Sequence, residues 1–357
     1  MKQLFITVVL CLSMTPMAST ATVTSSIAAN SKTVYMVVWR GCEEACQGFK
    51  DYLTSNEYPV EVIVRDAGRD RSTLDFFLDE AKLISPDLVV TWGTRVTKAL
   101  IGTRTEYGSE TKLGQIPSLF MIVADPLGAD IIAEKNKTGR PNVAGIRNRV
   151  SEDVQIRAMR EYLHVNKIGV VYSNAELNSV LNTQKLKALA PEMEFEIVEA
   201  LYALDEAGKP VPNQFEAKIS ELATAGVDVV YVGSSSYNLA NSDRFTQAAI
   251  KHGLPVASAY DAMVTDSSAL ISVSNKYYRV GQLAANQAVK ILFEGMTPGE
   301  LPIAELSRYS MSINMAVARQ MSLFPPIQLM RFANLVNIET SINQNTANEK
   351  GNSRGSQ

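Results

Sequence analysis

The sequence predicts an α/β protein of two Rossmann-like lobes, each a parallel sheet with helices on both faces. Between residues 33 and 125, short apolar runs alternate with amphipathic stretches. This order of strand, helix, strand and helix is typical of a parallel sheet. From residue 167 onward the same order begins again. The repetition predicts a second lobe like the first, joined to it by a hinge that the chain crosses more than once.

The first lobe is expected to contain four strands with helices between them. Each apolar run has the length of a strand, and the last two runs end on Gly93 and Asp125. The stretches between them place apolar residues at helical spacing, as Leu74, Phe77 and Leu78 do in the second stretch. The expected strands cover residues 33–40, 60–67, 87–93 and 117–125, and the expected helices cover 42–53, 72–84 and 94–102.

The second lobe repeats those strands. The run VDVVYVG corresponds to DLVVTWG, and both end on glycine. The run LPVASAYD corresponds to IPSLFMIVAD, since each has an aliphatic residue before a proline near its start and ends on aspartate. The alternative is that two unrelated α/β domains share this order by chance. The expected strands of this lobe cover residues 167–173, 195–204, 227–233 and 254–261.

The remaining segments are expected to complete both lobes. They comprise a strand at 269–274, a long helix at 276–295, a strand around 305–314 and a short helix ending at Pro325-Pro326. We therefore assign residues 33–147 and about 272–300 to the N-terminal lobe, and residues 148–271 and about 301–338 to the C-terminal lobe. Residues 341–357 have almost no apolar side chains, so a disordered tail is expected there.

The N-terminus has the features of a secretory signal peptide. Lys2 supplies a positive charge, and residues 4–12 form an apolar stretch too short to cross a bilayer about 30 Å thick. Small residues follow, so residues 1–21 are predicted to be removed and the mature protein to lie in the periplasm. Lipidation at Cys11 is disfavoured because Leu10 precedes it, where a lipid-modification site requires Gly or Ala.

Two cysteines, Cys42 and Cys46, remain in the mature chain. A separation of four residues on a helix brings their Cα atoms about 6 Å apart, which is within the range of a disulfide. Because an exported protein meets an oxidising compartment, we predict that they are bridged. The alternative is two free thiols on one helix face.

Composition excludes several classes of protein. The chain has 34 Lys and Arg against 37 Asp and Glu, and its net charge of −3 is too balanced for a nucleic-acid binder. Two histidines leave little material for a metal site, and we expect neither a metal nor a cofactor. The serines at 234–236 have no histidine base at a matching strand end. The protein is therefore expected to bind a molecule, not to be an enzyme.

The candidate binding site lies in the loops that follow the strands. In a parallel sheet the ligand binds at the carboxyl ends of the strands, and two facing lobes place two sets of these ends across one cleft. The candidate residues are Trp39, Arg40, Trp92, Gly93, Thr94 and Asp125 in the first lobe, and Asn174, Ser234, Ser235, Tyr260 and Asp261 in the second.

Each candidate has a chemical role and a structural alternative. The hydroxyl and amide groups are able to donate hydrogen bonds to a ligand carboxylate or to cap a helix. The aromatic rings offer flat apolar surface, but a Trp at a strand end is often part of the core. Arg40 suits an anion or a solvated surface, Asp261 suits an ammonium group, and Asp125 suits a turn before Pro126.

Three segments also resemble a known family. They are residues 116–148, 167–179 and 277–303, and they resemble the ABC-transporter substrate-binding proteins that include the tryptophan- and tyrosine-binding lipoproteins. The resemblance covers about residues 33–326. It implies a periplasmic-binding-protein type I fold whose lobes close on a small ligand, such as an amino acid or a related organic acid, and deliver it to an inner-membrane ABC permease.

The resemblance also implies site residues and one departure. The family's ligand contacts fall on Thr94, Asp125, Asn174 and Ser179. Relatives that bind amino acids tend to carry an acidic residue near Gly233, where this chain has three serines. Either Asp261 supplies that charge, or the ligand lacks an amine. We expect a monomer, and the alternative function is a periplasmic sensor that signals to a partner protein.

Overall fold

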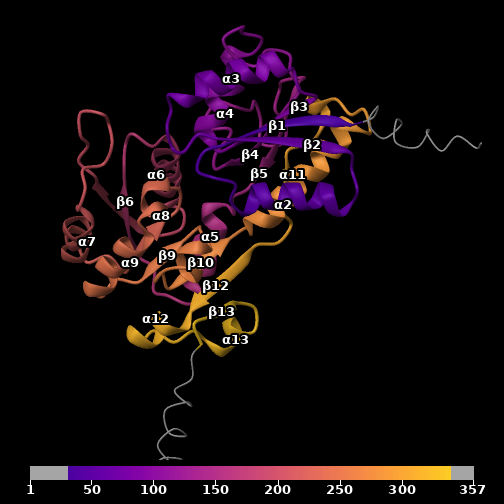
Figure 1. Cartoon of the computed structure of the whole chain (residues 1–357). Coiled ribbons are helices and arrows are strands. Elements are labelled where there is room, and N and C mark those ends of the chain that lie inside the picture. Colours follow the sequence, from indigo (N-terminus) through magenta and orange to yellow (C-terminus); the bar gives the residue numbers. More distant parts are fainter. Residues whose placement is uncertain (1–30, 339–357) are drawn as a thin grey trace, which may run out of the picture.

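A computed structural model describes residues 31–338, which form two lobes that lie one above the other in the view of Figure 1. The predicted signal peptide (1–21) and the predicted tail (341–357) lie outside the described residues. Helices and parallel strands alternate in both lobes, which confirms the predicted α/β class. Within residues 31–338, no helix has both the length and the apolar content that crossing a bilayer demands.

The first lobe is built on a six-stranded sheet of order β11-β5-β4-β3-β1-β2, in which every pair is parallel. Its strands are β1 (Lys32–Val38), β2 (Val60–Asp66), β3 (Leu88–Trp92), β4 (Ser118–Val123), β5 (Val143–Arg147) and β11 (Ala304–Glu305). Its helices are α2 (Glu44–Ser55), α3 (Thr73–Ile84), α4 (Thr94–Leu100) and α11 (Tyr277–Leu292), with short 3-10 turns η1 (Arg104–Glu106) and η2 (Pro298–Glu300).

The second lobe is built on a seven-stranded sheet of order β13-β12-β10-β9-β8-β6-β7, in which only the pair β10–β12 is antiparallel. Its strands are β6 (Lys167–Tyr172), β7 (Glu196–Leu201), β8 (Val229–Val232), β9 (Val256–Ser258), β10 (Ile271–Ser274), β12 (Ser310–Asn314) and β13 (Asn334–Val336). Its helices are α5 (Glu152–Arg160), α6 (Leu177–Leu189), α7 (Phe215–Thr224), α8 (Ser236–Ala240), α9 (Ser242–Lys251), α10 (Ala262–Thr265), α12 (Met315–Gln320) and α13 (Ile327–Met330).

The two sheets repeat one topology, which confirms the internal repeat expected from the sequence. In the first sheet β1 lies between β2 and β3, and β4 and β5 follow beyond β3. Strands β6 to β10 have the same spatial order in the second sheet. The equivalences proposed between DLVVTWG and VDVVYVG, and between IPSLFMIVAD and LPVASAYD, therefore hold as β3 with β8 and β4 with β9.

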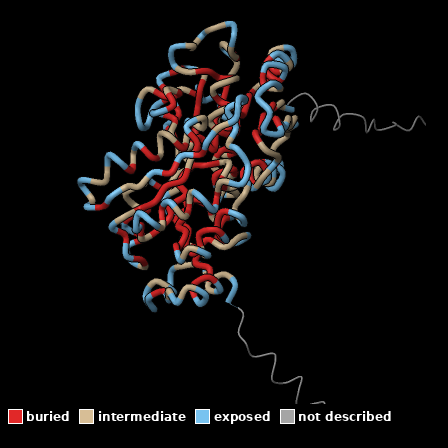
Figure 2. The backbone as a smooth tube through the Cα atoms, turned by 90° about the vertical axis from the view of Figure 1, so that its left-hand side faces the viewer, coloured by how far each residue is buried: buried red, intermediate tan, exposed pale blue. Residues whose placement is uncertain are grey.

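The composition of each strand follows from its place in the sheet. All residues of the central strand β3 are buried, and its sequence LVVTW has no charge. The edge strand β2, VEVIVRD, carries three charged residues and is only partly buried. Along β8, Val229 and Tyr231 belong to one apolar cluster while Val230 and Val232 belong to another. Because successive side chains point to opposite faces, helices cover the sheet on both sides, and the buried backbone runs through the middle of each lobe (Figure 2).

The chain passes between the lobes at three places, after β5, after β10 and after β11. Two boundaries differ from the expected ones. Residues 272–274 end β10, which pairs with β9 and β12 in the second sheet. The strand expected around 305–314 is two strands in different sheets, β11 beside β5 and β12 beside β10. Residues 306–309 separate them, of which 307–309 are exposed, so an apolar pattern alone did not reveal the crossing.

Helix α11 packs against α2 across two glycines. A Cβ atom at Gly281 would fall on the backbone carbonyl of Ala45, and one at Gly48 would fall on the carbonyl of Tyr278. Glycine is therefore required at both positions, because the two backbones touch directly. This crossing fixes α11, whose first residue, Tyr277, faces the space between the lobes.

Candidate functional site

A cavity of about 750 Å³ lies between the lobes and is lined from both sides by the segments that follow the strands. The first lobe supplies residues after β1, β2, β3 and β4, and the second supplies residues after β6, β7, β8 and β9. Both sets of carboxyl strand ends thus meet at one hollow, as the sequence predicted. The volume is typical of small-molecule sites.

Seven of the predicted site residues lie on the cavity wall and five do not. Those on the wall are Trp39, Arg40, Trp92, Gly93, Thr94, Ser234 and Tyr260. Those away from it are Asp125, Asn174, Ser179, Ser235 and Asp261. The residues on the wall directly follow strands, whereas most of the others hold neighbouring segments in place.

Three predicted aromatic residues each carry an arginine on a ring face. The guanidinium carbon of Arg40 lies 4.9 Å from the ring centre of Trp92, and that of Arg95 lies 4.9 Å from the ring centre of Trp39. The guanidinium carbon of Arg149 lies 4.6 Å from the ring centre of Tyr260. Such cation–π contacts hold a guanidinium group in one orientation. The structure thus places a cation on a face of each ring, and the stacking of these rings on a ligand stays a prediction.

Arg40 is a buried cation at the end of β1. Only 5% of its side chain is exposed, and its Nε donates to Glu43 Oε1 at 2.7 Å. Burial by itself would lower the pKa of Arg40, but the Glu43 carboxylate together with Tyr260 and Tyr277 outweighs that effect and leaves the pKa above its ordinary value. Arg40 is therefore a permanent positive charge on the wall, and the solvated surface role considered for it is excluded.

Arg95 and Arg149 have no carboxylate within 4 Å among residues 31–338. Burial lowers the pKa of Arg95, and the like charge of Arg71 lowers it further. Arg149 donates to the backbone carbonyl of Gly233 and to Ser234 Oγ, the latter at 3.1 Å. Arg149 thereby ties the first crossing segment to the loop after β8.

The cavity wall also contains buried polar atoms without a protein partner. Trp92, with 4% of its surface exposed, has an unpartnered Nε1, and Arg149 has an unpartnered Nε. Asn148, with 2% exposed, has an unpartnered Oδ1. A buried polar group without a partner costs roughly 1–3 kcal/mol. Two donors and one acceptor without a protein partner thus belong to residues of the cavity wall.

Glu176 lies on the wall, but its carboxylate is already in use. Its Oε1 accepts from the backbone N–H of Ser236 at 2.7 Å, and its Oε2 accepts from the hydroxyls of Ser235 and Ser179, each at 3.2 Å. Ser235 also accepts from the backbone N–H of Asn238 and so caps α8. Ser179 and Ser235 therefore fix the loop after β8, which corrects their predicted placement on the cavity wall.

Asp125 and Asp261 are turned to other partners, and Asn174 is exposed outside the wall. Asp125 Oδ1 accepts from the backbone N–H of Gly128 at 3.0 Å, the turn role that Pro126 suggested. Its Oδ2 pairs with Lys185 of the second lobe at 3.0 Å. Asp261 Oδ1 accepts from the hydroxyl of Ser272 at 3.0 Å. Neither carboxylate reaches the cavity, so the ammonium role considered for Asp261 has no support in this geometry.

A strained residue shapes the wall at the end of β4. Ile122 has φ of 56°, a conformation that is rare for a β-branched side chain. The pairing of β4 with β5 shifts register between Phe120 and Val123, so Ile122 is the bulged residue. Such strain costs about 1–3 kcal/mol and is typical of binding sites. The bulge turns Ile122 and Ala124 toward the cavity.

Sequence reasoning missed several wall residues. For Arg95, Arg149 and Tyr277 the reason is clear. Arg95 follows Thr94 directly, but it was assigned only to a helix and was not considered for the binding site. Arg149 follows β5, a strand that was not identified, and Tyr277 follows β10, which was not treated as part of the cleft. In each case the missed signal is an aromatic or basic side chain just past a strand.

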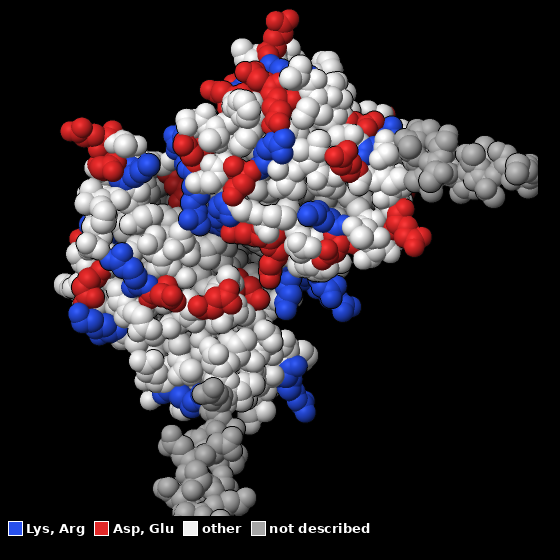
Figure 3. All heavy atoms as spheres, in the orientation of Figure 1, with Lys and Arg blue, Asp and Glu red and all other residues white. Residues whose placement is uncertain are grey.

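The mouth of the cavity is basic. Arg69 and Arg71 are exposed in the loop after β2, and Lys209 is exposed in the loop after β7 of the other lobe. Asp70 lies beside them, and hydrogen bonds from the backbone and hydroxyl of Ser72 hold its pKa below the usual range. Figure 3 shows Lys and Arg side chains at the boundary between the lobes, with Asp and Glu side chains beside them.

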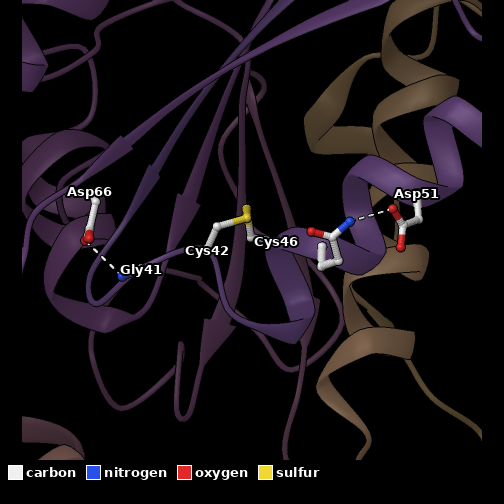
Figure 4. Close-up of a disulfide and its surroundings, with 6 residues drawn as sticks. Gly41, Cys42, Cys46, Asp51 and Asp66 are labelled. Atoms are coloured by element: carbon white, nitrogen blue, oxygen red, sulfur yellow. Dashed lines mark hydrogen bonds between the residues drawn. A yellow bond between two sulfur atoms is a disulfide. The ribbon is translucent and has the colours of Figure 1, made fainter.

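The loop after β1 is held by a disulfide between Cys42 and Cys46, which confirms the predicted pairing (Figure 4). Their Cα atoms are 5.1 Å apart. In the same loop the backbone N–H of Gly41 donates to Asp66 Oδ1 at 2.9 Å. Both contacts fix the segment that carries Arg40.

Replacing both Cys42 and Cys46 by serine is expected to lower the free energy of unfolding by about 2 kcal/mol. The bridge closes a loop with a sequence separation of only 4, so the loss of loop-closure entropy is small. Urea denaturation with and without reductant measures this effect. Reductant should destabilise the wild type and leave the double variant unchanged. An equal response of both proteins would contradict a bridge.

The chain is also similar to known proteins in sequence. The family model described as ABC transporter substrate binding protein matches residues 33–336. A tyrosine-binding protein of Clostridioides difficile is 25% identical over 215 residues, which is 60% of this chain and only 59% of that relative.

Two solved structures have similar folds. A conserved domain protein of Vibrio cholerae has a TM-score of 0.72 at 24% identity, and an ABC domain of Streptococcus pneumoniae in complex with L-Trp has a TM-score of 0.72 at 19% identity. Each comparison covers 85% of this chain and 99% of the other. Structures of other periplasmic binding proteins, such as a ribose ABC transporter protein of Conexibacter woesei, also share the fold, with a TM-score of 0.53.

Proposed function

The chain belongs to the family of ABC transporter substrate-binding proteins, and from this we propose that it captures a small carboxylate-bearing ligand and delivers it to an inner-membrane ABC permease. The observation that carries the proposal is the interlobe cavity, whose wall presents arginines from both sides of the cleft. A planar guanidinium binds a carboxylate or a phosphate through two parallel hydrogen bonds. The predicted signal peptide supports a periplasmic location.

Binding would proceed by closure of the hinge. Arg40 and Arg95 belong to the first lobe, and Arg149 is tied to the loop after β8 in the second. A ligand that contacts both sets is bound more tightly when the lobes are together, so it shifts the population toward the closed form. Three crossing segments permit rotation of one lobe against the other without unfolding either sheet.

The ligand class is that of an amino acid or a related organic acid. The named relatives are a tyrosine-binding protein and a structure in complex with L-Trp. Catalysis is not part of the proposal. Neither His164 nor His252 lies on the cavity wall, and the hydroxyl of Ser234 accepts from Arg149 and from Asn178 without a base beside it.

Thermal unfolding in the presence of small acids tests this function. Protein freed of bound ligand by unfolding and refolding is mixed with L-tryptophan, L-tyrosine, benzoate, phthalate and phenyl phosphate in turn. A ligand at 100 times its Kd stabilises the folded state by about 2.7 kcal/mol, which raises the Tm by several degrees. If no acid of this panel, and no molecule that co-purifies with the protein, raises the Tm, the binding function is contradicted.

A further inference from the structure

We propose that the ligand of this cavity is a small organic dianion, with two carboxylates or one phosphate monoester, and not the zwitterionic head group of an amino acid. The inference rests on the proposed binding function and narrows its ligand class. Three independent features of the cavity wall support it: the count of charges, the kind of unpartnered polar atoms, and the separation of the arginines between the two sides.

The wall carries far more positive than negative charge. Among described residues it includes Arg69, Arg71, Arg95, Arg149 and Lys209, together with Arg40, which Glu43 already pairs, against Asp70 and Glu176. The chain as a whole has a net charge of −3, so this excess is local. Glu176 accepts three hydrogen bonds through its two oxygens, and the exposed Asp70 accepts from Ser72 through Oδ1. Apart from Asp70 at the mouth, the wall residues therefore offer an ammonium group only a carboxylate that three donors already engage.

The buried polar atoms point to the same ligand. Trp92 Nε1 and Arg149 Nε are donors without partners, whereas Asn148 Oδ1 is the one unpartnered buried acceptor among the described wall residues. Anionic oxygens only accept hydrogen bonds, and an ammonium group only donates them. Donors outnumber acceptors among these unpartnered atoms, which favours a ligand with anionic oxygens.

The arginines are divided so that two anionic groups, or one doubly charged group, can be bound at once. Arg40 and Arg95 are held against Trp92 and Trp39 in the first lobe, and Arg149 is held against Tyr260 of the second. Desolvation raises the pKa of Tyr277 on the same wall to about 12, so its phenol stays neutral and able to donate. Like charges from both lobes repel one another, and two negative charges on a ligand would relieve that repulsion better than one.

The two tryptophans of the chain, Trp39 and Trp92, both lie on the cavity wall, so intrinsic fluorescence reports binding at this site alone. We would titrate refolded protein at pH 8 with four probes that share a phenyl ring. These are phthalate and phenyl phosphate as dianions, benzoate as a monoanion and L-phenylalanine as a zwitterion. L-Tryptophan, which itself fluoresces, would be measured by calorimetry.

At least one dianion should bind roughly ten times more tightly than benzoate, and both amino acids should bind more weakly still. The stronger of the two dianions identifies dicarboxylate or phosphate as the source of the charge. Raising the salt concentration should weaken dianion binding more than benzoate binding.

Arg95→Gln should reduce the preference for the dianion over benzoate from about tenfold to about threefold or less. Arg308→Gln, which removes an exposed arginine away from the cavity, is the matched control and should keep the preference. Tighter binding of L-phenylalanine or L-tryptophan than of both dianions would overturn this inference and leave the proposed function standing. Absence of binding by every probe, and by any molecule that co-purifies with the protein, would contradict both.

Discussion

Replacing Arg149 by methionine is expected to lower the affinity for the dianion that binds best, phthalate or phenyl phosphate, about 100-fold. Arg149 lies where the chain first crosses between the lobes, and it donates to the Gly233 carbonyl and to Ser234 Oγ. Its Nε is buried without a partner. Removing a partly buried charge that binds an anion costs about 2.7 kcal/mol, which corresponds to that factor. Titration by fluorescence of Trp39 and Trp92 measures it.

Two further variants separate charge from geometry at this position. Arg149→Lys keeps the positive charge but loses the planar fork of donors, so we expect a loss of about tenfold. Arg308→Met removes a surface arginine and should leave the affinity unchanged. The melting temperature of each variant is recorded in parallel. An Arg149→Met protein with the wild-type affinity would show that this guanidinium does not contact the ligand.

Replacing Gly281 by leucine is expected to destabilise the protein by more than about 3 kcal/mol. Even the first added carbon atom would fall on the backbone carbonyl of Ala45 in α2, and a helix backbone is unable to yield as a flexible side chain does. The two helices would have to separate, which would also move Tyr277 at the start of α11. Overpacking of a well-packed interface typically costs about 1–3 kcal/mol, and a clash between two helix backbones exceeds that range because neither backbone yields.

The matched control is Gln282→Leu, which adds the same side chain one position further along α11. Gln282 is only partly buried, so its replacement should change the free energy of unfolding by no more than about 0.5 kcal/mol. Urea denaturation of both variants, with their slopes compared, distinguishes loss of stability from a change in the unfolded state. Equal stabilities of the two variants would contradict the close helix crossing.

Much of the fold was predictable because it depends on local patterns. A strand covered on both faces must be an uncharged apolar run, and LVVTW and VVYV show this directly in β3 and β8. The repetition of such runs in the same order predicted two sheets of one topology. The crossing between β11 and β12 was missed because it occurs within four residues, 306–309, a length that leaves no distinct pattern in composition.

Part of the site was also predictable, because it too depends on local sequence patterns. A residue just past a buried strand lies at the carboxyl edge of the sheet, and Trp39, Trp92 and Tyr260 were found in this way. Whether such a residue faces the cavity is decided by its partners. Asp125 faces Lys185, and Asp261 faces Ser272, contacts between residues 60 and 11 positions apart in sequence.

The sequence by itself thus determined the fold class, the internal repeat, the disulfide and the edge of each sheet where a ligand would bind, because each depends on the order and spacing of nearby residues. Only the tertiary structure decided the charge of the cavity. Arg40, Arg95 and Arg149 come from separate segments and are spread over more than 100 residues of a chain that is slightly acidic overall. They line one cavity only because the chain crosses between the lobes and the ends of the two sheets face each other. No local sequence pattern indicates this arrangement.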